Sequence, residues 1–227
     1  MSKEKPYPPQ YYQDYLGLET ILDSQKLKSD EYGQRAHDEM LFIIIHQVYE
    51  LWFKQILFEL DSVLEIFSKK EINETHIGTA VSRLSRIIEI QKILIDQIHV
   101  LETMTPMDFL DFRDFLIPAS GFQSVQFRKI ENKLGLKVED RYTYGDANYC
   151  TYLHESDQEK VKASESGKSL FDLMESWLER TPFLNWGETS FWDEYEQAVS
   201  NMLHDDRRLI ETNEKLSDIE KEKHLIY

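Results

Sequence analysis

Cysteine and glycine are scarce in this sequence, and their scarcity excludes several kinds of structural and binding motif. Its 227 residues include one cysteine, Cys150, so no disulfide can form within the chain and a reducing compartment is expected. No neighbouring pattern marks Cys150 as a nucleophile. The eight glycines form neither a phosphate-binding loop nor a dinucleotide fingerprint, and no cysteine pair or HExxH motif is spaced for zinc. The common nucleotide-binding and zinc-enzyme classes therefore have no motif here.

Positive charge is also in short supply. The 26 Lys and Arg residues are outnumbered by 42 Asp and Glu residues, which gives a net charge of -16. No basic block offers a track for phosphates, so nucleic acid and anionic membrane surfaces are poor partners. The N-terminal residues lack an apolar signal segment, and charged residues interrupt the longest apolar runs before they reach the length of a membrane span. We expect a cytoplasmic protein.

Strand patterns, internal repeats and low-complexity tracts are absent as well. Apolar residues make up 41% of the chain and recur at helical spacing. We therefore predict an all-α fold, a helical bundle built on two long antiparallel helices. As a single domain it would comprise an N-terminal arm (1–20), a helical core (about 36–135), an irregular polar insertion (about 137–168) and C-terminal helices (about 169–224).

The two long helices are predicted from apolar residues spaced three or four positions apart. The first covers residues 36–68, and its stripe is too wide for a surface helix: Leu41, Ile44, Ile45, Val48, Leu51, Trp52, Ile56 and Leu60. The second covers residues 76–103, after a cap at Asn73 or Thr75. Its expected buried stripe is Val81, Leu84, Ile88, Ile95 and Ile98.

Shorter helices are predicted after this hairpin. Thr105-Pro106 begins one, with proline at the favoured first position, and residues 117–121 break it. Further helices are expected over residues 122–134 (stopped by Gly135), near 155–165, and over 189–214.

One ionisable side chain lies inside the apolar central helix. His46 follows three isoleucines, and Phe42 and Glu50 lie four residues before and after it, so the three side chains share a helical face. Spacing alone favours a core histidine bonded to a carbonyl or to Glu50. The alternative is an imidazole that lines a mostly apolar pocket and serves as acid, base or hydrogen-bond partner.

A second polar side chain is surrounded by aromatic residues. Phe109 precedes Arg113 by four residues on the predicted helix. Arg113 could form a structural salt bridge to Asp111 or Asp114, which spacing favours, or a bidentate clamp for the carboxylate of a ligand. The small residues at 119–121 would let a flat ligand approach the backbone, although a simple turn explains them equally well.

Two long segments carry a resemblance to a known family. Residues 37–63 (HDEMLFIIIHQVYELWFKQILFELDSV) and 101–135 (LETMTPMDFLDFRDFLIPASGFQSVQFRKIENKLG) resemble tryptophan 2,3-dioxygenases, the animal-type sequences most of all. Residues 15–25 (YLGLETILDSQ), 169–184 (SLFDLMESWLERTPFL) and the later FWDEY are similar too. The resemblance runs from about residue 11 to about residue 200 and favours the functional interpretations of His46 and Arg113.

The resemblance implies an activity, a cofactor and an assembly. Members of the family are helical proteins that bind haem b and insert both atoms of O2 across the C2–C3 bond of the indole of L-tryptophan. The product is N-formylkynurenine, the first intermediate of the kynurenine pathway of tryptophan catabolism. The resemblance also implies a homotetramer in which N-terminal arms reach into the neighbouring subunit's site.

The same resemblance assigns roles to individual residues. His46 is the catalytic position and hydrogen-bonds the indole N–H, while Arg113 clamps the substrate carboxylate. The rest of the substrate pocket comprises Phe42, Ile43, Ile44, Ile45 and Phe109, with Tyr12, Tyr15 and Leu16 donated by a neighbouring arm. Phe109, Ser120 and Gly121 lie beside the haem.

One part of the family pattern is not found. The family's iron is held by a proximal histidine followed by a glycine-rich loop, whereas His204 and His224 lie among charged residues and match no ligand position. We therefore expect an incomplete part of a larger domain, from a split, cleaved or truncated enzyme, active only when another segment supplies the axial histidine. A relative that has lost haem is the third alternative.

Two other functions remain open on the sequence. One is a non-enzymatic helical protein without haem, which binds tryptophan or acts as a scaffold. The other is a haem-dependent aromatic hydroxylase of the same superfamily. A haem absorption band separates the first from the dioxygenase, and analysis of the product separates the second.

Overall fold

The computed structural model describes residues 7–141, 153–180, 185–186, 189–213, 216 and 221. These fall into two compact units, residues 1–173 and 174–227, and each unit is described by itself. Nearly all of the regular structure is helical, which confirms the predicted all-α fold class. Cys150 and His224 lie outside the described residues.

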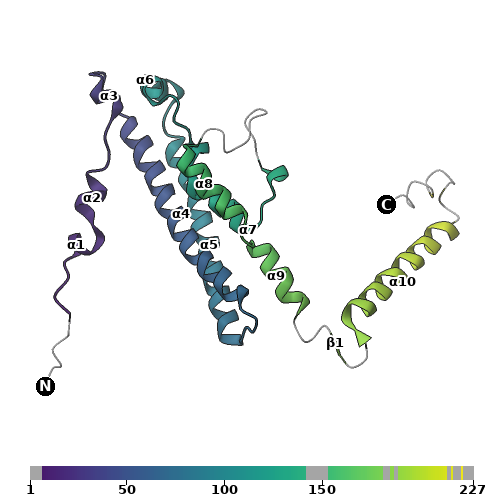
Figure 1. Ribbon diagram of the computed structural model, residues 1–227. Helices are drawn as coiled ribbons and strands as arrows, with labels where there is room; N and C mark the ends of the chain where they lie inside the picture. The colour runs from purple at the N-terminus through teal and green to yellow at the C-terminus, as the bar shows by residue number, and fades with distance from the viewer. Residues whose placement is uncertain are drawn as a thin grey trace. The chain divides into compact units, whose positions relative to one another are not determined.

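Two long helices form the centre of the first unit, and Figure 1 shows them side by side. They are α4 (Glu39–Ser68) and α5 (Glu74–Leu101). The Gln97 amide reaches the carbonyl oxygen of Ile45, early in α4, whereas Arg86 pairs with Glu59 further along α4 at 2.5 Å. Because the contacts run in opposite directions along the two helices, the pair is antiparallel.

The helical hairpin has an apolar core. Its buried side chains are Ile45, Ile56, Leu60, Val63, Ile66 and Phe67 of α4, and Ala80, Ile87, Ile90 and Leu94 of α5. Asn73 caps α5 by accepting a hydrogen bond from the backbone N–H of His76 at 2.9 Å. Of the two caps that the sequence allowed, Asn73 or Thr75, the structure therefore has Asn73.

The buried stripe predicted for α5 is wrong. Val81, Ile88 and Ile95 are 57%, 51% and 66% exposed, Ile98 is 46% exposed, and Leu84 is only half-buried. The reason is that α5 carries apolar residues on more than one face, and periodicity does not say which face meets α4. On α4 the prediction holds at Ile45, Ile56 and Leu60 but not at Ile44 and Leu51, which are exposed.

Among the described residues, α4 is the one helix long and apolar enough to cross a membrane, which the sequence had not led us to expect. The central helix of a water-soluble protein meets the same two criteria, so they are a weak indication. Here α4 buries Glu39 and Glu59, and each carboxylate accepts hydrogen bonds from other protein groups. We therefore describe α4 as the central helix of the hairpin.

Three short helices precede α4. They are α1 (Tyr12–Leu16), α2 (Leu18–Leu22) and α3 (Lys28–Glu31). The tyrosines of α1 are exposed, Tyr12 by 73% and Tyr15 by 75%. Gln25, which follows α2, contacts α4: its side-chain amide donates a hydrogen bond to the side-chain oxygen of Gln47 at 2.6 Å.

The remaining helices of the first unit follow α5 in the order predicted. They are α6 (Pro106–Leu116), the 3-10 helix η1 (Gly121–Gln123), α7 (Val125–Leu134), the 3-10 helix η2 (Val138–Asp140) and α8 (Glu155–Glu165). Gly135 ends α7 with a φ of +99°, and an added Cβ there would lie 2.9 Å from the Phe171 Cβ. A glycine is thus required twice, by backbone conformation and by packing.

Helix α9 (Leu170–Glu179) runs from the first unit into the second. In the second unit, the two-residue strands β1 (Asn185–Trp186) and β2 (Thr189–Ser190) form an antiparallel pair, with Asn185 opposite Ser190. They precede α10 (Phe191–Thr212), which confirms the last predicted helix to within two residues at each end. Most of the described α10 side chains are exposed.

Candidate functional site

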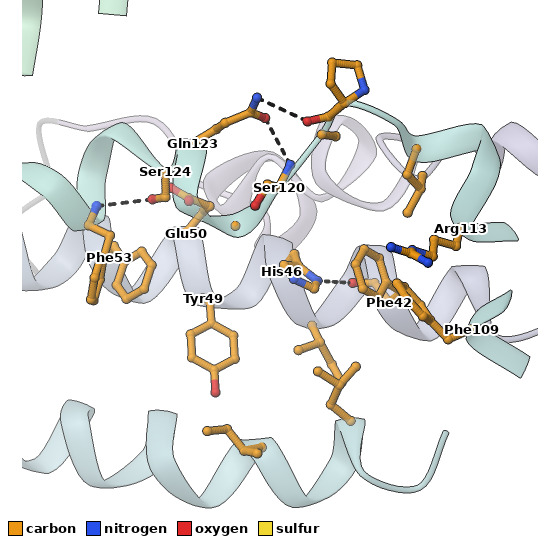
Figure 2. A pocket seen from close by; sticks show the side chains of 18 of the residues that line it. Phe42, His46, Tyr49, Glu50, Phe53, Phe109, Arg113, Ser120, Gln123 and Ser124 are labelled. Atoms are coloured by element: carbon orange, nitrogen blue, oxygen red, sulfur yellow. Dashed lines mark hydrogen bonds between the residues drawn. The ribbon is translucent and has the colours of Figure 1, made fainter. Parts of the chain in front are cut away.

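A cavity of about 880 Å³ lies against the first half of α4 (Figure 2). Its walls come from α4, the end of α5, α6, the segment after α6 and the start of α7. The lining is largely apolar: Phe42, Ile45, Tyr49, Phe53, Ile98, Leu101, Phe109, Leu116, Ile117, Pro118, Ala119, Gly121 and Phe127, with His46, Glu50, Arg113, Ser120, Gln123 and Ser124 as polar members. A mostly apolar cavity with a few polar groups is typical of a site for a small organic molecule.

His46 lines this cavity and is also bonded to its own helix. Its Nδ1 atom lies 2.7 Å from the carbonyl oxygen of Phe42, one turn earlier. A carbonyl oxygen can only accept, so Nδ1 carries the proton and donates it. In the neutral imidazole the Nε2 atom is then a hydrogen-bond acceptor. The two alternatives for His46 therefore both hold in part: it is bonded to a carbonyl, and it lines a pocket.

Glu50 lies on the same face of α4 as His46 but is held by a different partner. The Gln126 amide of α7 donates to the Glu50 side chain and to its backbone carbonyl, both at 2.8 Å. The hydroxyl of Tyr49 extends toward α5 and donates to the Leu94 carbonyl oxygen at 2.5 Å (Figure 2). Burial raises the pKa of the Tyr49 phenol. These bonds fix the cavity wall to α5 and α7.

An aromatic cluster joins α6 to the start of α4. The Phe42 ring lies 5.7 Å from Phe109 and 5.5 Å from Phe112, and the two α6 rings are 5.4 Å apart, centre to centre. Phe112 is fully buried. Aromatic pairs at these distances favour tilted or edge-on arrangements, as seen here. The cluster therefore sets where α6 stands relative to His46, because Phe42 also packs on the His46 ring at 4.1 Å.

Arg113 is the cationic side chain of the cavity. It projects from α6 next to Phe42 and Phe109 (Figure 2). Its side chain is exposed, and no ion pair joins it to Asp111, Asp114 or any other described residue. The structural salt bridge considered from the sequence is therefore not formed. A guanidinium with free donors at an apolar cavity is suited to a planar anion such as a carboxylate.

Helix α6 begins with a complete capping box. The Thr105 hydroxyl oxygen accepts from the Asp108 N–H at 3.3 Å, and the Asp108 carboxylate accepts from the Thr105 N–H at 2.9 Å and from its hydroxyl. These hydrogen bonds, the hydroxyl's first, lower the pKa of Asp108. With Pro106 at the first helical position, the start of α6 is sharply defined. The capping box thus fixes the residue at which α6, the helix that carries Arg113, begins.

The segment between α6 and α7 forms the far wall of the cavity. The Ser120 N–H donates to the Gln123 side-chain oxygen at 3.0 Å, while the Ser120 hydroxyl accepts from the Phe122 N–H at 3.3 Å. An added Cβ at Gly121 would meet no atom within 4 Å, so the backbone there borders open space. A flat ligand could therefore approach this backbone closely.

The structure brings most of the predicted site residues together. Those that line the cavity are Phe42, Ile45, His46, Phe109, Arg113, Ser120 and Gly121. Ile43 and Ile44 do not, since they point to other faces of α4, and Ile44 is 42% exposed. The exposed arm residues Tyr12, Tyr15 and Leu16 do not line it either.

Sequence reasoning missed several lining residues. Tyr49 and Phe53 continue the face of Phe42 and His46 at spacings of three and four, so helical periodicity could have found them. Phe127 faces Phe53 with ring centres 5.5 Å apart, a contact between distant helices that spacing does not reveal. No group of three or more His, Cys, Asp or Glu side chains suited to a metal ion occurs in the described part of the chain.

Comparison with known proteins decides the family. The family model described as tryptophan 2,3-dioxygenase matches residues 4–226. The chain belongs to this family. The curated tryptophan 2,3-dioxygenase of Bdellovibrio bacteriovorus is 55% identical over 217 residues, which is 96% of this chain and 60% of that protein. Those of Alteromonas mediterranea (47% identical, 96% and 60%) and Dictyostelium discoideum (50% identical, 91% and 52%) are similarly related.

The chain thus spans between about half and 60% of the length of the curated tryptophan 2,3-dioxygenases it matches. The two segments that suggested the family, residues 37–63 and 101–135, are those that form α4, α6, η1 and α7. Every residue that lines the cavity, except Ile98, comes from these two segments.

Proposed function

We propose that this chain forms the substrate pocket of a haem-dependent dioxygenase that converts L-tryptophan and O2 to N-formylkynurenine. One observation carries the proposal: the guanidinium of Arg113, which forms no ion pair with a described residue, and the imidazole of His46 line the same apolar cavity. L-Tryptophan has a carboxylate at one end, an apolar indole at the other, and a single N–H on that indole. The three features of the cavity match these three features of the substrate.

Arg113 and His46 would hold the substrate at both ends. The guanidinium takes the carboxylate by two parallel hydrogen bonds, which also orients the amino acid. The indole lies against Phe42 and Phe109, whose rings exclude water. The bare Nε2 of His46 accepts the hydrogen bond of the indole N–H, because Nδ1 is already engaged with the Phe42 carbonyl. His46 thereby acts by positioning and polarity, without having to remove a proton.

The residues present are compatible with one face of a haem. Phe109, Ser120 and Gly121 line the cavity, and an added Cβ at Gly121 would meet no atom within 4 Å, which leaves room there for a flat macrocycle. When bound, the haem iron supplies the activation of O2, while the protein supplies position and polarity. The axial histidine would come from a segment outside this chain.

We also propose that the active form is a homotetramer in which the arm of one chain completes the cavity of another. The exposure of Tyr12, Tyr15 and Leu16 supports this, since aromatic side chains that are 73% and 75% exposed in one chain gain most from burial by a second. If a second polypeptide carries the rest of the family's length, the same cavity would form in that assembly.

The test uses protein purified from the cells that make it. We expect a visible spectrum with the Soret band of haem, and turnover of L-tryptophan under ¹⁸O₂ that gives N-formylkynurenine with label in both new carbonyl oxygens. The intact mass of every co-purifying polypeptide is measured on the same sample.

Other outcomes favour the alternatives. A single polypeptide that binds L-tryptophan but carries no haem and makes no product would indicate a binding or scaffold protein. A product with one labelled oxygen and an intact indole would indicate an aromatic hydroxylase. Either result rejects the dioxygenase proposal.

A further inference from the structure

Glu39 is a fully buried carboxylate for which the proposed chemistry has no use. It lies in the first turn of α4, one turn before Phe42. It accepts hydrogen bonds from the Lys28 N–H at 2.7 Å, the Ser29 N–H at 2.9 Å and the Ser29 hydroxyl at 2.5 Å. No ion pair with Glu39 occurs in the described part of the chain. A buried charge needs such a complete set of donors, so the arrangement is specific.

Ser29 is the other half of this contact. It is also fully buried, and its hydroxyl oxygen accepts the Ala36 N–H at 3.0 Å while its carbonyl accepts the Gln34 N–H at 2.9 Å. Hydrogen bonds therefore connect Ser29 both to the segment between α3 and α4 and to the Glu39 carboxylate of α4. We call this set of hydrogen bonds between Ser29 and Glu39 the α3–α4 lock.

The α3–α4 lock is connected to α6 by an aromatic contact. Tyr32, the residue that ends α3, stacks on Phe115 of α6 with ring centres 5.1 Å apart and planes 19° apart. The same helix packs on Phe42 of α4 through Phe109 and Phe112. Helix α6 thus contacts both α3 and the start of α4, and the α3–α4 lock joins those two elements to each other.

We infer that Glu39 and Ser29 are positioning residues for substrate recognition: the α3–α4 lock holds α6 so that Arg113 stands at the cavity. Arg113 follows Phe112 directly and precedes Phe115 by two residues, so it lies between the two contacts that hold α6. The inference rests on the proposed function, in which Arg113 receives the substrate carboxylate.

The experiment compares Glu39→Gln with Glu31→Gln in the purified protein. Glu31 is a matched control, because it lies in α3 beside Lys28 and Ser29, is about half exposed, and forms its ion pair with the Lys28 side chain. An amide at position 39 keeps the size of the side chain but replaces one of the two accepting oxygens by an NH2 group. The donors on that side, those of Lys28 or of Ser29, then lose their acceptor. Affinities are measured by calorimetry for L-tryptophan and for tryptamine, which lacks the carboxylate.

We expect Glu39→Gln to weaken L-tryptophan binding about tenfold or more, because a displaced clamp loses much of its effect. Tryptamine binding should change less than about twofold, because the indole end of the cavity is untouched. Glu31→Gln should match the wild type for both. Equal losses for the two ligands in Glu39→Gln would show a general structural defect and overturn the inference.

Hydrogen–deuterium exchange without ligand provides the second measurement. In Glu39→Gln, exchange should rise in residues 27–36 and also in 106–116, while the part of α5 in residues 74–90 stays as in the wild type. A rise confined to 27–36 would overturn the coupling to α6. If Glu39→Gln does not fold, Ser29→Ala removes one hydrogen bond of the α3–α4 lock and is judged by the same criteria.

These readouts separate failure of the inference from failure of the proposed function. A wild-type protein that binds L-tryptophan no better than tryptamine rejects the clamp role of Arg113 and the inference with it. A wild-type preference for L-tryptophan that survives in Glu39→Gln rejects only the α3–α4 lock.

Discussion

The Nδ1 atom of His46 lies 2.7 Å from the carbonyl oxygen of Phe42, and this contact determines what the imidazole can offer a ligand. Because Nδ1 keeps its proton and donates it in the hydrogen bond to the carbonyl oxygen, Nε2 of the neutral ring is an acceptor. The same Phe42 packs on Phe109 of α6, so the orientation of His46 and the place of α6 depend on one residue of α4.

Replacement of His46 by alanine should lower turnover of L-tryptophan about tenfold without abolishing it, since one hydrogen bond of roughly 1.5 kcal/mol is lost. The decisive measurement compares L-tryptophan with 1-methyltryptophan, which has no indole N–H. The wild type should prefer L-tryptophan, and His46→Ala should have lost most of that preference. His99→Ala, at an exposed histidine near the end of α5, is the control. Complete loss of haem from His46→Ala would count against the role given to His46.

Replacement of Arg113 by glutamine should weaken L-tryptophan binding about 10- to 100-fold, because the charge-assisted hydrogen bonds to the substrate carboxylate are lost. Tryptamine should bind equally to the variant and the wild type. Calorimetry with both ligands checks this, with Arg207→Gln as the control because that exposed arginine belongs to α10. The clamp would be rejected if the two ligands lost the same affinity.

Loss of the α6 capping box should destabilise the protein in a pH-dependent way. Thr105→Ala removes the cap at a cost of about 1 kcal/mol at neutral pH, measurable by urea unfolding. The pKa of Asp108 is lowered from its ordinary value of 3.8 in the folded state. Its contribution is therefore present above pH 4 and is lost as the pH falls through the lowered pKa.

The stability difference between wild type and Asp108→Asn should accordingly shrink as the pH drops below about 4. Asp96→Asn, on the exposed surface of α5, serves as the control for the loss of an exposed carboxylate. A difference that grew toward acid pH would contradict the assigned hydrogen bonds.

The N-terminal arm should matter for binding but not for the folding of the chain that carries it. Tyr15→Ala removes a ring that is 75% exposed, so thermal unfolding of the isolated chain should be unchanged. Activity should fall if the ring completes a neighbour's cavity. Co-expression of Tyr15→Ala with Arg113→Gln should restore part of the activity, because an intact arm can then meet an intact cavity. No recovery, with both chains present in one oligomer, would reject arm donation.

Gly135→Ala should destabilise the protein by about 2–4 kcal/mol, from a strained left-handed backbone and from a Cβ only 2.9 Å from that of Phe171. Gly78→Ala is the matched control, because Gly78 lies within α5 and an added Cβ there meets nothing. That substitution should be neutral or stabilise by up to about 1 kcal/mol. Chemical denaturation of both variants compares them directly; similar stabilities would contradict the role of Gly135.

The sequence predicted where the helices begin and end far better than which of their faces are buried. The periodic segments, the Asn73 cap, the Thr105-Pro106 start and the Gly135 stop depend on neighbouring residues, and all of them are found in the structure. The exposed Ile88 and Ile95 show where this reasoning ends, since an apolar residue is buried only if another helix covers it.

The sequence by itself determined the all-α class, the family, and the pairing of Phe42 with His46 and of Phe109 with Arg113, because these follow from spacing along one helix and from characteristic segments. Only the tertiary structure decided that Arg113 forms no ion pair with Asp111 or Asp114, that Glu50 is bonded to Gln126, and that Glu39 is buried against Ser29. Each of these depends on which distant segment meets a given helix face. Periodicity along the chain carries no information about that partner.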